Sequence, residues 1–185
     1  MSEDIIELIL DDHDTFRRQF SALDSAQDPE ELRAIWEPLA ALLDLHAVAE
    51  EAVFYPLLLR DADDAEEETE DAIGDHNDIR DGVHQAQRHP IGSADWWTAV
   101  RTARVANSNH MAEEEDDGLA DFRRTESLET RIDVGRKFLE FKKRHAGAVG
   151  IDTSDKDPQG YVNAVEAEID DTTRGSLGIG SLRGR

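Results

Sequence analysis

The spacing of four histidines constrains the fold of this chain more than any other feature. The intervals between them are 33, 30 and 34 residues, for His13, His46, His76 and His110. Each interval is long enough for one helix–turn–helix hairpin, and the most turn-like segments lie midway, around Asp28–Pro29, Asp61 and Ser93. Residues at equal distances from a turn lie at the same depth in an antiparallel bundle, at about 1.5 Å of rise per residue. All four imidazoles are therefore predicted to meet in one layer of one core.

Apolar residues that recur at steps of three and four predict five helices. The expected ranges are residues 3–25, from Asp28 past Leu57, 64–88, 94–124, and 128 to about 146. Asp28 and Pro29 suit the start of the second helix, whereas Pro38 predicts a kink or a delayed start. The inward stripe of that helix is expected to contain His46, Glu50 or Ala49, Val53 and Leu57.

The expected fold is all-α: an antiparallel up-down-up-down four-helix bundle with an additional C-terminal helix and a flexible tail. We divide the chain into a bundle over residues 1–125, an amphipathic helix over 126–148, and a tail over 149–185. The tail is rich in Gly, Ser and Asp, and at most a short helix is expected around Tyr161–Ile169.

Composition narrows the classes of function. The chain has 43 acidic and 20 basic residues, a net charge of −23, which argues against nucleic-acid and anionic-membrane partners. The absence of cysteine excludes disulfides, iron–sulfur clusters and thiolate zinc sites. The first residues lack a basic segment, and no apolar run approaches the length of a membrane span. A soluble cytoplasmic protein is therefore expected.

Two of the histidines open His-x-x-x-Glu pairs, His46/Glu50 and His110/Glu114, whose side chains project from one helix face about one turn apart. Imidazole with carboxylate suits iron, manganese or zinc. Burying such a cluster without a cation would be costly. We therefore predict a metal site formed by His13, His46, Glu50, His76, His110 and Glu114. A metal-free bundle with the same residues is the alternative.

The order H…HxxxE…H…HxxxE resembles the hemerythrin-like HHE cation-binding family over roughly residues 1–125. The matching segments read LHAVAEEAVFYP, GDHNDIR and NHMAEEED. The resemblance implies a four-helix bundle that holds an oxo- or hydroxo-bridged pair of iron ions, with manganese or zinc as second choices. It also implies that Glu50 and Glu114 bridge the ions, that His13 and His46 bind one, and that His76 and His110 bind the other.

One departure from the oxygen-carrying members bears on function. Those proteins have a fifth histidine one turn from the one at His76, but here the neighbours at that spacing are Ala72 and Arg80. His84 is two turns away and His89 falls in a turn. More open coordination favours reaction with a small molecule over reversible storage of oxygen.

These observations predict a non-haem di-iron protein that binds or reacts with hydrogen peroxide, O2 or NO, in oxygen binding or oxidative stress. No side chain is expected to act as a nucleophile, and whether the protein is an enzyme stays open. The alternative is a non-catalytic iron, oxygen or redox sensor, or an O2-binding protein, that signals to a protein partner through the C-terminal segment. Tyr55 is expected either to pack or to donate a hydrogen bond near the site, and Glu113 and Asp117 to face solvent.

Overall fold

The computed structural model describes residues 3–61 and 65–177, and within these ranges the chain forms helices and no strand. The all-α expectation is confirmed there. The helices are α1 (Ile5–Ser25), α2 (Pro29–Ala49), α3 (Tyr55–Asp61), α4 (Ala65–Gln87), α5 (Ala94–Asp116), α6 (Gly118–Thr125), α7 (Leu128–Arg144) and α8 (Pro158–Leu177), with a π-helical turn at Glu50–Phe54 and a 3-10 turn at Ala146–Ala148. Among the described helices, none combines the length and apolar character needed to cross a membrane.

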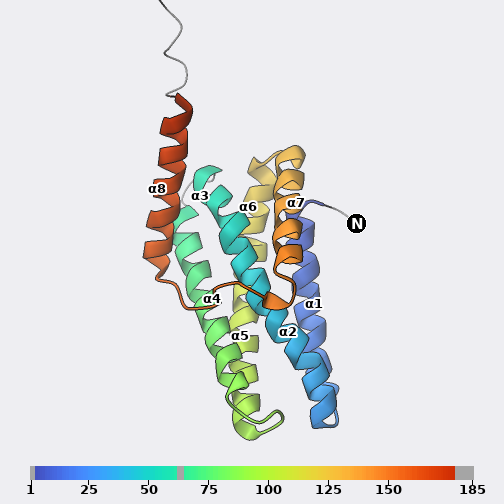
Figure 1. The fold of residues 1–185 in the computed structure, drawn as a ribbon. Coiled ribbons are helices and arrows are strands. Elements are labelled where there is room, and N and C mark those ends of the chain that lie inside the picture. Colours follow the sequence, from blue (N-terminus) through green and yellow to red (C-terminus); the bar gives the residue numbers. More distant parts are fainter. Residues whose placement is uncertain (1–2, 62–64, 178–185) are drawn as a thin grey trace, which may run out of the picture.

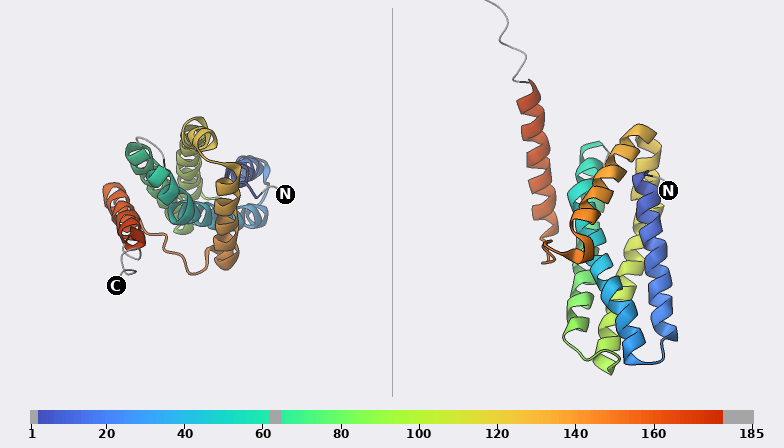
Figure 2. Two further views of the ribbon diagram at one scale, coloured as in Figure 1. Left: turned by 90° about the horizontal axis from the view of Figure 1, so that it is seen from above. Right: turned by 45° about the vertical axis from the view of Figure 1, so that its right-hand side comes forward.

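Four long helices, α1, α2, α4 and α5, lie side by side (Figure 1). The turn between α1 and α2 and the turn between α4 and α5 lie at the same end of the molecule (Figure 1). Helix α7 packs on α1 and α2, and α8 packs along α3 and α4, outside the four long helices (Figure 2). The arrangement is consistent with a hemerythrin-like helical bundle.

The starts of three helices follow from side-chain capping. The carboxylate of Asp4 accepts a hydrogen bond from the backbone of Ile6, and Asp28 accepts from the first turn of α2. Ser93 caps α5 in the same way. Each cap satisfies backbone N–H groups that a helix cannot pair internally. Helix α2 begins at Pro29 and continues through Pro38, so the predicted delayed start does not occur.

Two apolar clusters lie on either side of the histidine layer. On α1, Ile9 belongs to one cluster and Phe16 to the other, and His13 lies between them. On α4, His76 separates Ile73 from Ile79 in the same way. Close-packed apolar side chains therefore enclose the polar layer toward both ends of the bundle.

The second helix departs from the prediction just after His46. The π-helical turn at Glu50–Phe54 inserts one residue into the helical repeat, so the inward face moves on by one position. The expected stripe residues Val53 and Leu57 are only half-buried. Phe54 and Leu58 are buried in their place. The prediction of an unbroken α-helical stripe was wrong here.

The predicted helix over residues 94–124 is interrupted at Asp117, whose backbone angles, φ −112° and ψ −80°, lie outside the helical region. Gly118 follows, and a Cβ atom there would lie 2.3 Å from Oε1 of Glu68 on α4. The break therefore occurs where the chain leaves α5 and passes close to the Glu68 side chain of α4.

Helix α7 ends at Arg144, close to the end predicted for the fifth helix. Helix α8 extends over Pro158–Leu177 and is longer than the short helix expected around Tyr161–Ile169. The division of the chain into domains stays a prediction.

Candidate metal centre

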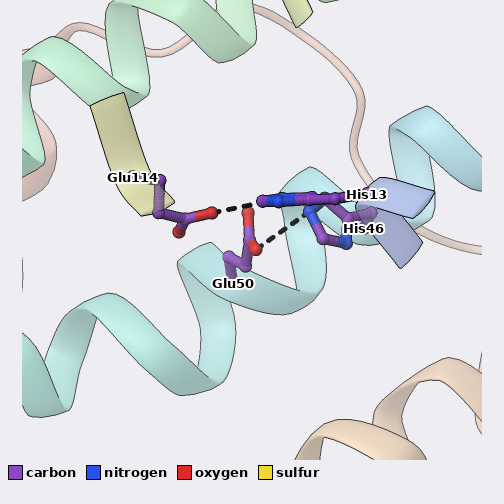
Figure 3. A group of neighbouring side chains, drawn as sticks. All are labelled: His13, His46, Glu50 and Glu114. Carbon is purple, nitrogen blue, oxygen red and sulfur yellow. Dashed lines mark ion pairs between the residues drawn. The ribbon is translucent and has the colours of Figure 1, made fainter. Parts of the chain in front are cut away.

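The six residues predicted to hold a metal converge at the centre of the bundle. His13 comes from α1, His46 from α2, His76 from α4, and His110 and Glu114 from α5, while Glu50 is the first residue of the π-helical turn. All six are buried, with exposed fractions between 0% and 6%. Figure 3 shows His13, His46, Glu50 and Glu114 directed toward one another, with His46 and Glu50 on successive turns of one continuous helical stretch.

The ligand-type atoms form two groups that share Glu50. His13, His46, Glu50 and Glu114 form one group, and Glu50, His76 and His110 form the other. The two oxygens of Glu50 face different groups, because Oε1 lies 2.9 Å from Nε2 of His46 and Oε2 lies 3.3 Å from Nε2 of His76. Glu50 therefore lies between two pairs of imidazoles.

Glu114 occupies a similar position on the opposite side. Its Oε2 atom lies 3.3 Å from Nε2 of His13 and 3.8 Å from Nε2 of His110. A carboxylate thus approaches one histidine of each pair from α5, as Glu50 does from the π-helical turn. The assignment of all six residues as metal ligands stays a prediction. It requires their nitrogen and oxygen atoms to face one another, as they do here.

Several atoms at the centre have no hydrogen-bond partner although they are buried. They are His13 Nε2, His46 Nε2, both carboxylate oxygens of Glu50, and Glu114 Oε2. Buried polar atoms are nearly always paired, so such a concentration points to a missing ligand. The Nε2 atoms of His76 and His110 lie 3.2 Å apart. Two nitrogens that bind one ion at about 2.1 Å and a nearly right angle are about 3 Å apart. The residues fit a metal.

A second layer of carboxylates faces the outer nitrogen of each histidine. Nδ1 lies 2.9 Å from Asp12 in His46, 2.9 Å from Glu51 in His76 and 2.8 Å from Glu115 in His13. In His110 the corresponding carboxylate, Asp75, is farther away at 3.7 Å. Such partners fix the tautomer and orientation of metal-binding imidazoles, so that Nε2 points toward the centre.

The comparison with protein families decides the assignment. The model of the hemerythrin HHE cation-binding domain matches residues 4–120, more than half of the chain. The chain belongs to the hemerythrin family of HHE cation-binding domains. The family resemblance predicted from the sequence is thereby confirmed. No curated protein and no solved structure matches the chain in the corresponding comparisons.

The outer carboxylates of this HHE domain are a group that the sequence prediction missed. Each one is adjacent in the sequence to a predicted ligand: Asp12 to His13, Glu51 to Glu50, Asp75 to His76, and Glu115 to Glu114. Both hairpins therefore contain an Asp-His pair followed by His-x-x-x-Glu-Glu. That repeat was the available signal, because it places one additional acid next to a ligand on every long helix.

The side chains around the HHE centre carry more negative than positive charge. The carboxylates of Asp12, Glu50, Glu51, Asp75, Glu114 and Glu115 are opposed by the cationic groups of Arg17, Arg80, Lys142 and Lys156. With neutral imidazoles, six carboxylates exceed four cations by two negative charges. Unpaired charge of this kind is costly in a buried site, and bound cations would compensate it.

The pKa values of the histidines reflect the same excess. Burial alone would lower the pKa of His46, but the carboxylates of Glu50 and Asp12 raise it to about 9. Burial opposes protonation of His110 too, while Asp75, Glu50 and Glu114 raise its pKa to about 10. These imidazoles therefore hold protons in the metal-free domain. Because only a neutral imidazole binds a metal, binding would displace those protons.

Acidic side chains line a cavity of about 630 Å³ that reaches this centre. Its wall includes His110, Glu114 and Tyr55, together with Asp75 and a set of further acids, Glu67, Glu68, Asp71, Glu113, Asp117 and Asp121. Glu113 and Asp117 are exposed to solvent, as predicted. The cavity joins the surface to the half of the centre that contains His110.

Three other residues considered in the sequence occupy distinct places. Tyr55 is buried, and its hydroxyl donates a hydrogen bond of 3.4 Å to Oε1 of Glu114, so it both packs and contacts a predicted ligand. His84 lies outside the centre, with Nε2 at 3.4 Å from Oγ1 of Thr153. The guanidinium of Arg80, one turn after His76, pairs with Glu51 at 2.5 Å. No described histidine takes the fifth position found in oxygen-carrying hemerythrins.

Proposed function

We propose that this up-down-up-down bundle is a non-haem di-iron protein that binds or reacts with hydrogen peroxide, O2 or NO. The observation that supports it best is the position of Glu50 between two pairs of imidazoles, with both of its oxygens buried and each oxygen within 3.3 Å of a nitrogen of a different pair. One carboxylate that faces two groups suits two ions held close together. Nitrogen and oxygen donors without sulfur suit iron, and manganese and zinc are the other candidates.

Bound iron ions would supply the redox change and the site at which the small molecule binds. The chain's own residues hold and enclose that site. Glu50 and Glu114 would keep the two ions together, and the outer carboxylates hold the Nδ1 protons of the imidazoles. The apolar clusters exclude water from the two ends of the histidine layer, and the acidic cavity connects the layer with the surface.

The cavity supports small neutral molecules as the reactants. Its acidic wall repels anions from this approach to His110 and Glu114, whereas it has little effect on uncharged peroxide, O2 or NO. Each half of the centre has two imidazoles. Arg80, one turn after His76, occupies the place from which a further histidine would fill a coordination position of the ion. Open positions favour reaction over simple storage.

The test is anaerobic reconstitution with Fe²⁺, followed by metal analysis and optical spectroscopy while O2 or peroxide is admitted. About two irons per chain with the charge-transfer bands of a bridged diferric pair are expected. Glu50→Ala and Glu114→Ala are expected to lose those bands. Retention of a coupled pair in either variant, or an absence of bound iron in the wild type, contradicts the proposal.

A second candidate, a non-catalytic sensor, is favoured by one contact. The hydroxyl of Tyr161 on α8 donates a hydrogen bond of 2.5 Å to the backbone carbonyl of Glu51, which links the C-terminal segment to the centre. A change at the centre could therefore reach that segment. Repeated consumption of peroxide by iron-loaded protein supports an enzyme, and a single stoichiometric reaction supports the sensor.

A further inference from the structure

Two lysines from the part of the chain after the family match reach the outer carboxylates. The match ends at residue 120, and we call residues 126–177 the C-terminal segment. Lys142 belongs to α7, and Lys156 to the connection between the 3-10 turn and α8. Lys142 pairs with Asp12, and Lys156 pairs with Glu51.

The first pair acts on His46. Nζ of Lys142 lies 2.6 Å from Oδ1 of Asp12, and Oδ2 of Asp12 lies 2.9 Å from Nδ1 of His46. Phe138, one turn earlier on α7, is fully buried and packs edge-on against the His46 ring at 6.2 Å. The ammonium of Lys142 lies 5.3 Å from the centre of the Phe138 ring. Helix α7 thus holds Asp12, the hydrogen-bond partner of His46, through Lys142, and it packs against the His46 ring through Phe138.

The second pair acts on His76. Glu51 accepts from Lys156 and lies 2.9 Å from Nδ1 of His76. Two backbone contacts hold the lysine in place: Asn77 donates to the carbonyl of Lys156 at 2.7 Å and accepts from its N–H at 2.9 Å. Glu51 is buried, so its contact with a lysine from outside the bundle is a built feature of the site.

The two lysine–carboxylate pairs support histidines in different halves of the centre. His46 belongs to the first group of ligand-type atoms and His76 to the second. The carboxylates that face His13 and His110 have no contact with a lysine of the C-terminal segment among the described residues. Glu115, which faces His13, pairs with Arg17 of α1. Asp75 lies 3.7 Å from Nδ1 of His110. One lysine of the segment therefore acts on each half.

We propose that Lys142 and Lys156 are positioning residues through which the C-terminal segment sets how firmly each half of the centre holds its ion. The reason is general: a carboxylate on the outer nitrogen of a ligand histidine fixes the ring, and loss of such support lowers metal affinity about 10- to 100-fold. Without its lysine, each carboxylate loses its main restraint from that segment. This proposal rests on the proposed function, because it assumes that each chain binds two ions, one in each half of the centre.

The test measures the release of iron from the full chain, loaded anaerobically with Fe²⁺, to an excess of a colorimetric ferrous chelator. In Lys156→Met about half of the iron is expected to leave severalfold faster than from the wild type, which is less than the roughly 10-fold effect of losing the carboxylate itself, because Arg80 still pairs with Glu51. Lys142→Met is expected to accelerate one half as well, and the double variant both. Lys143→Met, an exposed neighbour on α7, is the matched control and should release iron at the wild-type rate.

Further variants separate positioning from folding. Lys142→Arg and Lys156→Arg keep the charge and are expected to restore slow release, and the visible bands should shift in the methionine variants alone. If a methionine variant does not fold, the glutamine variant at the same position, which retains a hydrogen-bond donor, replaces it. Release at the wild-type rate with unchanged bands, even with a lowered melting temperature, overturns the proposal.

The wild-type protein distinguishes this failure from failure of the proposed function. If the wild type binds Zn²⁺ and not iron, the di-iron proposal fails, and the same release experiment is carried out with Zn²⁺ and a zinc chelator. Faster release from the two lysine variants then still supports the positioning role, and equal release contradicts it.

Discussion

Glu50 and Glu51 are adjacent in the sequence, yet both side chains are buried and they contact the rings of the centre from opposite sides. Glu50 approaches the Nε2 atoms, whereas Oε1 of Glu51 lies 2.9 Å from Nδ1 of His76. Adjacent residues of an α-helix project about 100° apart and seldom share one site. The π-helical turn that begins at Glu50 widens the helix here, and π-helical turns often occur at functional sites.

Replacing Glu51 should destabilise the protein strongly. Burial alone would raise the pKa of Glu51, but hydrogen bonding and charge from His76, Arg80 and Lys156 lower it to about 2. In Glu51→Ala the guanidinium of Arg80, which is fully buried, loses its carboxylate. Removing one partner of a buried ion pair costs about 3–5 kcal/mol. Urea unfolding of the metal-free protein measures the loss.

The control for this prediction is an exposed pair of the same chemistry. Arg33 and Glu37 are separated by 2.9 Å on α2, and both side chains are 59% exposed. Glu37→Ala should change the free energy of unfolding by no more than about 0.5 kcal/mol. Similar losses in the two variants would show that the Glu51 cluster is not the buried network described here.

The close approach of α4 and α5 predicts opposite effects for two glycines of the same helix. A methyl group at Gly82 would lie 2.5 Å from the backbone nitrogen of Ala103, whereas one at Gly74 meets no atom within 4 Å. Alanine is favoured over glycine in a helix by about 1 kcal/mol. Overpacking costs about 1–3 kcal/mol or more, and here the obstacle is backbone that cannot move aside.

Gly82→Ala is therefore expected to lower the free energy of unfolding by about 2 kcal/mol, and Gly74→Ala to raise it by up to about 1 kcal/mol. Thermal and urea unfolding of both variants measure this. Because α4 and α5 hold His76 and His110 3.2 Å apart, Gly82→Ala should also weaken metal binding. A stabilised Gly82→Ala variant would show that the helices are not in such close contact.

The sequence was sufficient to predict the histidine layer because two simple periodicities agree. The helical repeat places His13, His46, His76 and His110 on inward stripes, and the hairpin spacing places them at one depth. The two His-x-x-x-Glu pairs add carboxylates on the same faces. All six predicted residues lie together in the structure. The periodicities depend only on local geometry, which a sequence specifies directly.

The supporting contacts could not be predicted in this way, for two physical reasons. Glu51 becomes buried only because the π-helical turn shifts the helical phase, and no residue between Glu50 and Phe54 marks such a turn. The lysines come from far along the chain: Lys142 is 130 residues from Asp12, and Lys156 is 105 residues from Glu51. Their pairing depends on how the C-terminal segment packs on the bundle, which periodicity does not determine.

A pH-dependent penalty is expected from Glu68 in the wall of the acidic cavity. Burial, with the carboxylates of Asp117, Asp121 and Glu114, raises the pKa of Glu68 to about 7. The folded protein then binds more protons than the unfolded chain, in which a glutamate titrates at about 4.3. Stability due to this group is complete at low pH, falls as the pH rises toward 7, and stays low above it.

Glu68→Gln removes that penalty. The free energy of unfolding should rise by about 1 kcal/mol at pH 8, a figure reduced for the partial exposure of the group, and change little at pH 4.5. Glu67→Gln removes the same charge from an exposed position on α4 and is the control. A gain of equal size at pH 4.5 and pH 8 would contradict the assignment, since it could not arise from deprotonation of Glu68.

Metal binding should stabilise the folded protein through the buried imidazole nitrogens and carboxylate oxygens that face one another at the centre. An ion that binds only the folded state adds about 2.7 kcal/mol when its free concentration is 100 times the dissociation constant. The melting temperature of the metal-free protein is therefore expected to rise on anaerobic addition of Fe²⁺. In His46→Ala about half of that rise should disappear, because the group that contains His46 loses one of its two imidazoles while His76 and His110 keep the other group. His145→Ala is the control. His145 directly follows α7 and lies outside the centre, and its Nδ1 atom is 2.9 Å from the backbone carbonyl of Val149. An equal rise in wild type and His46→Ala would place the stabilising ion elsewhere and remove His46 from the ligand set.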